Sequence, residues 1–352
     1  MKSVIANKEM ASVMDIEAIC KRILSTQKKS GEIPWHDGGK TDPWDHVEAA
    51  MGLSAGGFLE DARRAFDWLI TMQLEDGSWH SAWRDGVPED ETRDSNMSSY
   101  IAVGVFHHYL ITGDIHFLKK MWGAVQRAVE FALGMQGDQG EIFWARNSAG
   151  KIDRMSLLTG SSSVFFSVKC GLAIAKRLGR DMAGWRNALK RLKEAINEKP
   201  HLFNATKSRY SMDWFYPILS GAVTGASAEA RITARWKKFI VNGQGVLCVS
   251  DQPWVTMAET SEFVLTIAAM GNKKLARIIF DWIADKVFDD GSFWCGHTYP
   301  EMVIWPEEKM AWTNGVAILA ADAIFNLTPG ASLFSHDSWD GADFSFIPEK
   351  NA

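Results

Sequence analysis

The sequence TDPWDHVEAAMGLSA at residues 41–55 decides the fold class, because a polar cluster runs directly into an apolar helix rich in small residues. Five later stretches repeat this arrangement, each after a more ordinary amphipathic helix. Their polar clusters lie at residues 94–100, 159–163, 211–216, 259–262 and 307–312. Six units in this chain leave about 59 residues for each, enough for one helical hairpin. The repeat predicts an all-α (α/α)6 toroid, with twelve helices in an inner and an outer ring.

The spacing of apolar residues divides the helices between the two rings. Helices with apolar residues every three or four positions and with Lys and Arg on the other face are expected outside. They cover residues 14–28, 57–74, 115–136, 181–197, 226–240 and 272–287. Helices rich in Ala, Gly, Ser and Val are expected inside, over residues 43–55, 95–111, 160–178, 211–223, 259–270 and 308–326. One toroid domain over residues 14–328 follows, with an N-terminal extension (1–13) and a C-terminal arm (329–352).

Composition and charge narrow the possible partners. The net charge is -5 and no basic stripe stands out, which argues against a nucleic-acid partner. No apolar run reaches the roughly 20 residues needed to span a membrane, and the first residues lack the features of a secretory signal. The four cysteines are far apart and show no metal or disulfide pattern. We therefore expect reduced thiols, no metal site and a cytoplasmic protein, while the oligomeric state stays open.

If the six hairpins close into a ring, all six polar clusters surround one mouth. Carboxylates at this mouth are the candidate catalytic groups: Asp45, Glu48, Asp213, Glu259 and Glu262. Asp45 and Glu48 are three residues apart, as are Glu259 and Glu262, so each pair shares a helix face. Two acids in different environments, such as Glu48 or Asp213 against Glu262, would supply a general acid and a base.

Aromatic and polar residues near the same clusters are the candidate substrate-binding groups. Sixteen Trp are present, and large aromatics at this density often line a ligand cavity. The candidates are Trp35, Trp44, Asp94, Asn96, Tyr100, Arg209, Trp214, Tyr216, Trp254, Trp294 and Trp312. The alternative is structural: the aspartates could cap helices and the tryptophans could pack in the core.

A second repeat carries a resemblance to a known family. Residues 27–35 read QKKSGEIPW and residues 136–144 read QGDQGEIFW, with a related stretch at 64–79. The last resembles the QW repeat of squalene cyclases, and the whole chain resembles the bacterial proteins called prenyltransferase-like or terpenoid-cyclase-like. The resemblance implies an α/α toroid enzyme that acts on an isoprenoid-type substrate with carboxylic acids in a Trp-lined central cavity. It implies no cofactor, except magnesium if the substrate is a diphosphate, and a structural role for the repeat.

Two alternatives stay open beside this isoprenoid hypothesis. Toroids of this kind also include glycosidases. Trp platforms suit a sugar ring, and a pair of carboxyl groups across a cleft suits glycoside cleavage. The chain could also be a binding protein that has kept the toroid without chemistry. An enzyme with a small-molecule substrate, either an isoprenoid or a carbohydrate, is the prediction from sequence.

Overall fold

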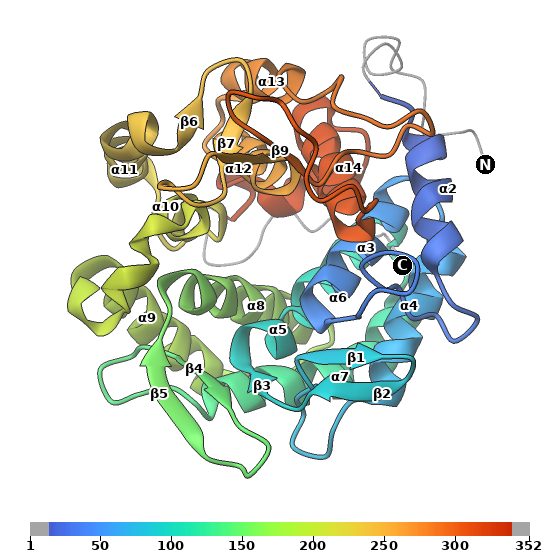
Figure 1. Cartoon of the computed structure of the whole chain (residues 1–352). Helices are drawn as coiled ribbons and strands as arrows, with labels where there is room; N and C mark the ends of the chain where they lie inside the picture. Colours follow the sequence, from blue (N-terminus) through green and yellow to red (C-terminus); the bar gives the residue numbers. More distant parts are fainter. Residues whose placement is uncertain (1–13, 340–352) are drawn as a thin grey trace.

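The computed structural model describes residues 14–339, which form two concentric rings of helices (Figure 1). The inner ring contains α3 (Pro43–Ala55), the consecutive pair α5 (Ser95–Ser99) and α6 (Ile101–Thr112), α8 (Leu158–Arg177), α10 (Ser211–Leu219), α12 (Met257–Ala269) and α14 (Ala311–Phe325). Each packs on the next around the ring, and α14 packs on α3, so the ring closes. The predicted (α/α)6 toroid is confirmed.

The outer ring contains the more amphipathic helices. They are α2 (Ile16–Thr26), α4 (Leu59–Met72), α7 (Ile115–Leu133), α9 (Ala183–Glu198), α11 (Gly225–Phe239) and α13 (Lys273–Asp281). Two inner helices differ from the sequence prediction. The predicted helix 95–111 is interrupted at Tyr100, which ends α5 and precedes α6. Predicted helix 211–223 ends early at Leu219, because Gly221 adopts a left-handed conformation (φ 76°).

All described strands lie in connections that lead from an outer to an inner helix, and the sequence analysis did not predict them. The first sheets are β1 (Ala82–Arg84) with β2 (Val87–Asp90), and β3 (Arg93–Asp94) with β4 (Phe143–Arg146) and β5 (Ile152–Ser156). A four-stranded antiparallel sheet contains β6 (Ile240–Val241), β7 (Gly245–Leu247), β8 (Trp254–Thr256) and β9 (Gly296–Thr298). Two 3-10 helices, η1 (Pro200–Leu202) and η2 (Ala205–Arg209), occupy the same kind of connection. These long connections surround the end of the ring where the inner helices begin.

The opposite end of the ring is closed by the last described residues. Short turns join inner to outer helices there, and η3 (Pro329–Phe334) and η4 (Asp337–Trp339) lie across that end. Leu333 and Phe334 are buried, and the Phe334 ring contacts the rings of His107 and Phe166. The N-terminal extension and residues 340–352 of the arm lie outside the described residues, and the domain boundaries stay a prediction.

The repeated glutamines join neighbouring outer helices. The side-chain amide of Gln27 donates to the carbonyls of Gly31 and Asp61, at 3.2 and 2.9 Å. Gln73 and Gln136 make the same pair of bonds one and two repeats later, reaching the carbonyls of Ala124 and Ala188. Each bond pair fixes the end of one outer helix against the next. These contacts are structural and lie outside the ring of carboxylates.

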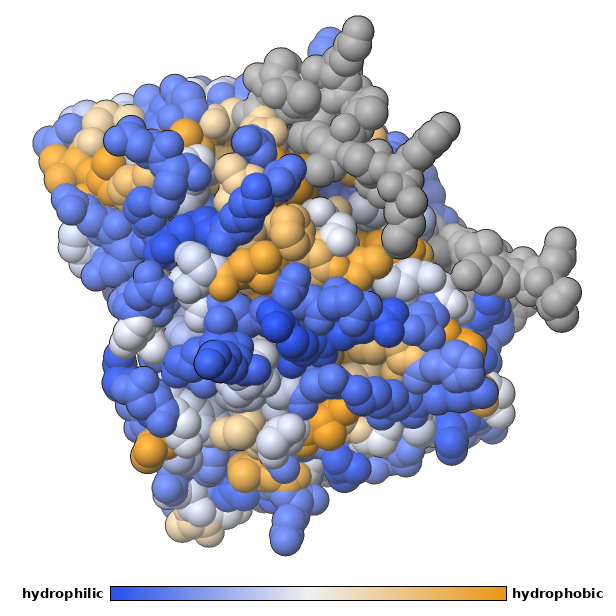
Figure 2. Space-filling view, turned by 90° about the vertical axis from the view of Figure 1, so that its right-hand side faces the viewer, coloured by the Kyte–Doolittle hydropathy of each residue, from blue (hydrophilic) through white to orange (hydrophobic). Residues whose placement is uncertain are grey.

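One described helix, α8, is long and apolar enough to cross a membrane by length and composition alone. Most of it is buried inside the toroid, as expected of a core helix. Seen from the side where α2 lies, the surface mixes hydrophilic residues with small apolar patches (Figure 2).

Two glycines allow α3 and α14 to pack closely behind the candidate site. A Cβ atom on Gly315 would lie 2.6 Å from the carbonyl oxygen of Glu48, and one on Gly52 would lie 2.5 Å from Gly315 Cα. We expect Gly315→Ala to lower the free energy of unfolding by about 1–3 kcal/mol, the usual range for overpacking. Denaturant titration measures this. Gly184→Ala in α9 is the matched control, because nothing lies within 4 Å of the added atom; equal stability of both variants would contradict the expectation.

Candidate active site

Carboxylates from two helices meet at the open end of the ring. Asp45 and Glu48 lie in the first turns of α3, and Glu259 and Glu262 lie in the first turns of α12. Both helices pack against α14, which separates them in the ring. Glu48 and Glu262 are buried, whereas Asp45 and Glu259 are partly exposed. The structure therefore brings together four of the five carboxylates predicted from sequence.

Asp42 organises the start of α3. Its carboxylate accepts the backbone N–H of Asp45 at 2.9 Å, which caps the helix, and Pro43 occupies the first helical position. Its other oxygen accepts the indole N–H of Trp35 at 2.5 Å. The predicted binding residue Trp35 is thus tied to the helix that carries Asp45 and Glu48, and Lys40 lies over its ring. Its role as a helix cap accounts for the position of Asp42. The candidate catalytic groups of α3 are therefore Asp45 and Glu48.

An aromatic group surrounds Glu48. The Tyr100 hydroxyl donates to Glu48 Oε1 at 3.3 Å, from the break between α5 and α6. The Tyr100 ring stacks on Trp44, with centroids 3.8 Å apart, and Tyr216 lies 5.6 Å from Trp44. The break at Tyr100 therefore places a hydroxyl donor on a carboxylate. Trp44, Tyr100 and Tyr216 form one wall of the candidate site.

Glu262 differs from Glu48 in its partners. Within residues 14–339, no hydrogen-bond donor contacts its carboxyl group, which is buried near Glu48 and Glu259. Glu259 accepts a bond from the Cys248 thiol at 2.9 Å. A buried carboxyl group without a donor is poorly solvated when ionised, so Glu262 favours its neutral form.

Burial and mutual repulsion raise the pKa values of three of these carboxyl groups. Burial is the largest cause in each case. The pKa of Glu48 rises to about 8, although the Tyr100 hydrogen bond opposes the rise. The pKa of Asp45 lies well above its usual range, because the charge and hydrogen bond of Asp42 add to burial. Nearby Glu48 and Glu259 likewise raise the pKa of Glu262 well above its usual range. Such groups favour their protonated forms and titrate together.

This proton uptake makes stability depend on pH. The pKa of Glu48 is about 8 in the folded chain against 4.5 for the free group, so the folded state holds a proton that the unfolded chain loses between these values. Stability from this source is complete below about pH 4.5 and is lost as pH rises to about 8. We expect the melting temperature of Glu48→Gln to fall less than that of the unmodified protein as the pH rises from 4.5 to about 8. Glu229→Gln, an exposed position on α11, is the matched control; an unchanged slope in Glu48→Gln would contradict the assignment.

Three predicted site residues lie away from this group. Asp213 accepts both the backbone N–H and the hydroxyl of Thr159, at 3.1 and 2.6 Å, and so caps the start of α8. Trp214 is fully buried and stacks on two phenylalanines of the core. Arg209 is exposed and pairs with Asp251 at 2.7 Å. A functional role for these three stays an untested prediction, and their contacts are those of structural residues.

The remaining predicted binding residues lie around the open end. Asp94 caps α5 through the backbone N–H groups of Asn96 and Met97. The side-chain oxygen of Asn96 and the indole nitrogen of Trp312, at the start of α14, are buried without a hydrogen-bond partner among the described residues. The other two are Trp254, whose ring meets that of Trp305, and Trp294, whose ring meets that of His297.

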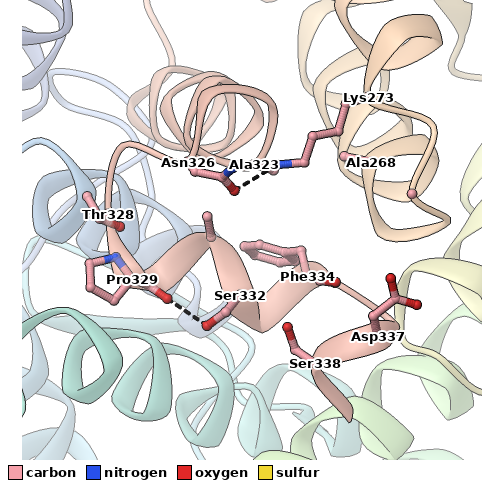
Figure 3. Close-up of a pocket in the computed structure, with 13 residues that line it drawn as sticks. Ala268, Lys273, Ala323, Asn326, Thr328, Pro329, Ser332, Phe334, Asp337 and Ser338 are labelled. Atoms are coloured by element: carbon pink, nitrogen blue, oxygen red, sulfur yellow. Dashed lines mark hydrogen bonds between the residues drawn. The ribbon is translucent and has the colours of Figure 1, made fainter. Parts of the chain in front are cut away.

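A cavity of about 490 Å³ lies at the closed end of the ring instead (Figure 3). It is lined by residues from the ends of α12 and α14, from the start of α13 (Lys273) and from residues 328–338, which include η3 and part of η4 and contribute Thr328, Ser332 and Asp337. Lys273 donates to Asn326 there at 2.7 Å. None of the carboxylates at the open end lines this cavity. Within residues 14–339, no group of three or more His, Cys, Asp or Glu could hold a metal ion.

Comparison with solved structures shows which proteins share the toroid. No protein-family model matches the sequence. The fold matches a solved wild-type glycosidase with a TM-score of 0.71 at 15% identity, covering 92% of this chain and 100% of that one. It also matches a GH63 mannosylglycerate hydrolase from Thermus thermophilus, with a TM-score of 0.69 at 11% identity over 86% and 99% of the two chains. These identities show a shared fold. Both solved proteins therefore share the α/α toroid of this chain.

A curated relative shows the family to which the chain belongs and, with it, the class of enzyme. The chain is 47% identical over 312 residues to the MMP endo-(1,4)-3-O-methyl-alpha-D-mannosidase of Mycolicibacterium hassiacum, a match that covers 89% of this chain and 86% of that protein. The chain belongs to the family of this mannosidase.

The terpenoid-cyclase resemblance and the isoprenoid function inferred from it are wrong. The 47% identity to a mannosidase, over 89% of this chain, overturns both. Together with the glycosidase folds, it supports the glycosidase alternative. The misleading signal has a physical origin. The Gln and Gly repeats join neighbouring outer helices, so they are a sign of the fold and not of the reaction. Aromatic content misled in the same way, since Trp79, Trp83 and Trp214 are core residues.

Proposed function

We propose that this enzyme hydrolyses internal α-(1,4) linkages in a mannose polymer that carries 3-O-methyl groups. The observation that carries the proposal is the 47% identity to an enzyme named for that activity, over nearly the whole of both chains. The carboxylates of α3 and α12 at the open end of the ring supply chemistry that suits glycoside cleavage.

In this proposal Glu262 is the general acid. Its buried carboxyl group, with no donor among residues 14–339, favours the neutral form and can give its proton to the glycosidic oxygen as the C1–O bond breaks. Glu48 is the base, because the Tyr100 hydroxyl favours its ionised form. It accepts a proton from the water whose oxygen bonds to C1. Because the pKa of Glu48 is about 8, the ionised base forms as the pH rises toward that value.

The roles given to Glu262 and Glu48 imply inversion at C1. A water that a base activates displaces the leaving group in one step, from the face of the sugar ring opposite to the general acid. This is the reaction of an inverting glycosidase. Cleavage of an α linkage would then release a β reducing end first.

The test is digestion of a 3-O-methylated α-(1,4)-mannan, followed by mass spectrometry of early products and NMR of the new reducing end. We expect a ladder of intermediate oligosaccharides with β anomers. Absence of cleavage, or release of monosaccharide alone, would contradict an endo-mannosidase.

A further inference from the structure

A cluster of exposed apolar side chains stands beside the candidate active site. Residues 296–305, here called the rim hairpin, run from β9 through a turn and back. Trp305 is 59% exposed, Val303 58% and Tyr299 43%, and the partly exposed Trp254 of β8 lies next to them. Exposed large apolar residues gathered in one segment mark a binding surface more often than isolated ones do.

The rim hairpin is held in place by its backbone. Thr298 and Val303 form a backbone bond of 2.9 Å, and the N–H of Trp305 donates to the Gly296 carbonyl at 2.9 Å. The Trp254 indole donates to the Trp305 carbonyl at 2.7 Å, and the two rings meet edge to face with centroids 5.2 Å apart. A Cβ atom on Gly296 would lie 2.6 Å from the Trp254 indole nitrogen, so a glycine is needed for this contact. The aromatic surface is thus fixed before any ligand arrives, which lowers the entropic cost of binding.

The rim hairpin is connected through β8 to α12, the helix that carries Glu259 and Glu262. It joins α13 to α14 at the end of the ring where the inner helices begin, and β9 pairs with β8, which leads directly into α12. The backbone N–H of Met257, the first residue of α12, donates to the carbonyl of Cys295. Cys295 in turn lies within electrostatic reach of Glu259 and Asp45. The hairpin and the carboxylates therefore lie at the same end of the ring.

We infer that Trp305, Tyr299 and Val303, with Trp254, form a subsite that binds O-methylated sugars of the glycan at a distance from the bond being cleaved. This inference rests on the proposed function. Aromatic rings present a large apolar face to the C–H surface of a sugar, and each methyl ether adds apolar area to be buried. An exposed surface of two Trp, one Tyr and one Val matches a methylated sugar better than an unmethylated one, which carries a hydroxyl at that position.

The test is calorimetric binding of 3-O-methylated α-(1,4)-mannan oligosaccharides to the full chain carrying Glu262→Gln, so that the ligand is not cleaved. We expect Trp305→Ala in this background to raise the Kd of long oligosaccharides about tenfold, as for truncation of a binding tryptophan. The Kd of short oligosaccharides, and that of unmethylated oligosaccharides of equal length, should rise less. Ile278→Ala on α13 is the matched control, because it removes an apolar side chain that is 43% exposed in the outer ring.

The outcomes separate the two proposals. Binding of the methylated oligosaccharides that is equal in Trp305→Ala and Ile278→Ala would overturn the subsite alone. Equal losses for methylated and unmethylated ligands would overturn the preference for methyl ethers. If the chain with an intact hairpin bound no mannan oligosaccharide, the proposed function would fail and the subsite with it. Circular dichroism and the melting temperature confirm that each variant is folded.

Discussion

Replacing Glu262 by Gln should lower kcat/KM on the methylated mannan by about 10²–10⁴-fold, the usual contribution of a general acid. The amide has the shape of the neutral carboxyl group but holds no transferable proton. The same variant should recover most of its activity on an aryl oligomannoside with a 2,4-dinitrophenyl leaving group, because this group departs without protonation. Steady-state kinetics on both substrates measure the effect.

The pH profile gives an independent test of this role. The wild-type rate should fall at alkaline pH as the acid ionises, since burial and neighbouring carboxylates raise the pKa of Glu262. On the activated substrate, Glu262→Gln should lose this alkaline decline. Equal losses on both substrates would show that Glu262 is not the acid. The variant should fold normally, because its carboxyl group is buried in the neutral form that Gln resembles.

Replacing Glu48 by Gln should lower kcat/KM by a similar factor, about 10²–10⁴-fold, but on both substrates. Activation of the attacking water is needed whatever the leaving group. In Glu48→Ala, added azide should restore turnover of the activated substrate, because the anion can bond to C1 without a base. The expected product is the β-glycosyl azide, identified by NMR. An α-azide would contradict inversion.

Asp45→Asn is the matched control for Glu48→Gln, since both residues lie on α3 and both have raised pKa values. Asp45 shares a hydrogen bond with Asp42, and this bond favours its neutral form. We therefore expect a smaller loss in Asp45→Asn than in Glu48→Gln. The reverse order would assign the base to Asp45.

The fold could be predicted from sequence because the toroid repeats one simple pattern six times. Helix α3 begins and ends where the sequence placed it, since Asp42, Pro43 and the small residues after them are local signals. The short strands could not be predicted in this way. They depend on pairing between segments distant in the chain, such as Arg93 with Arg146, and have no strong periodicity of their own.

The candidate site was only partly predictable for the same reason. The i, i+3 spacing placed Glu48 and Glu262 on helix faces, but Asp213 has a similar sequence context and caps α8 instead. Only the arrangement of neighbouring helices distinguishes a carboxylate of the candidate site from one that caps a helix. The rim hairpin was missed because its aromatic residues follow no helical period. The one available signal was an aromatic residue directly before a proline, at Tyr299 and again at Trp305. The cytoplasmic location, inferred from unpatterned cysteines, stays a prediction.

Closure of the ring at one end by η3 and η4 limits how a polymer can be handled. A tunnel open at both ends would let the enzyme thread a glycan and advance along it between cuts. In the part of the chain that the structure describes, η3 and η4 cover the other end. Under the proposed function, a glycan would therefore approach and depart through the end that carries the strands, and would lie across the opening. Each cut then requires a fresh encounter, or a sideways shift of the glycan along the opening.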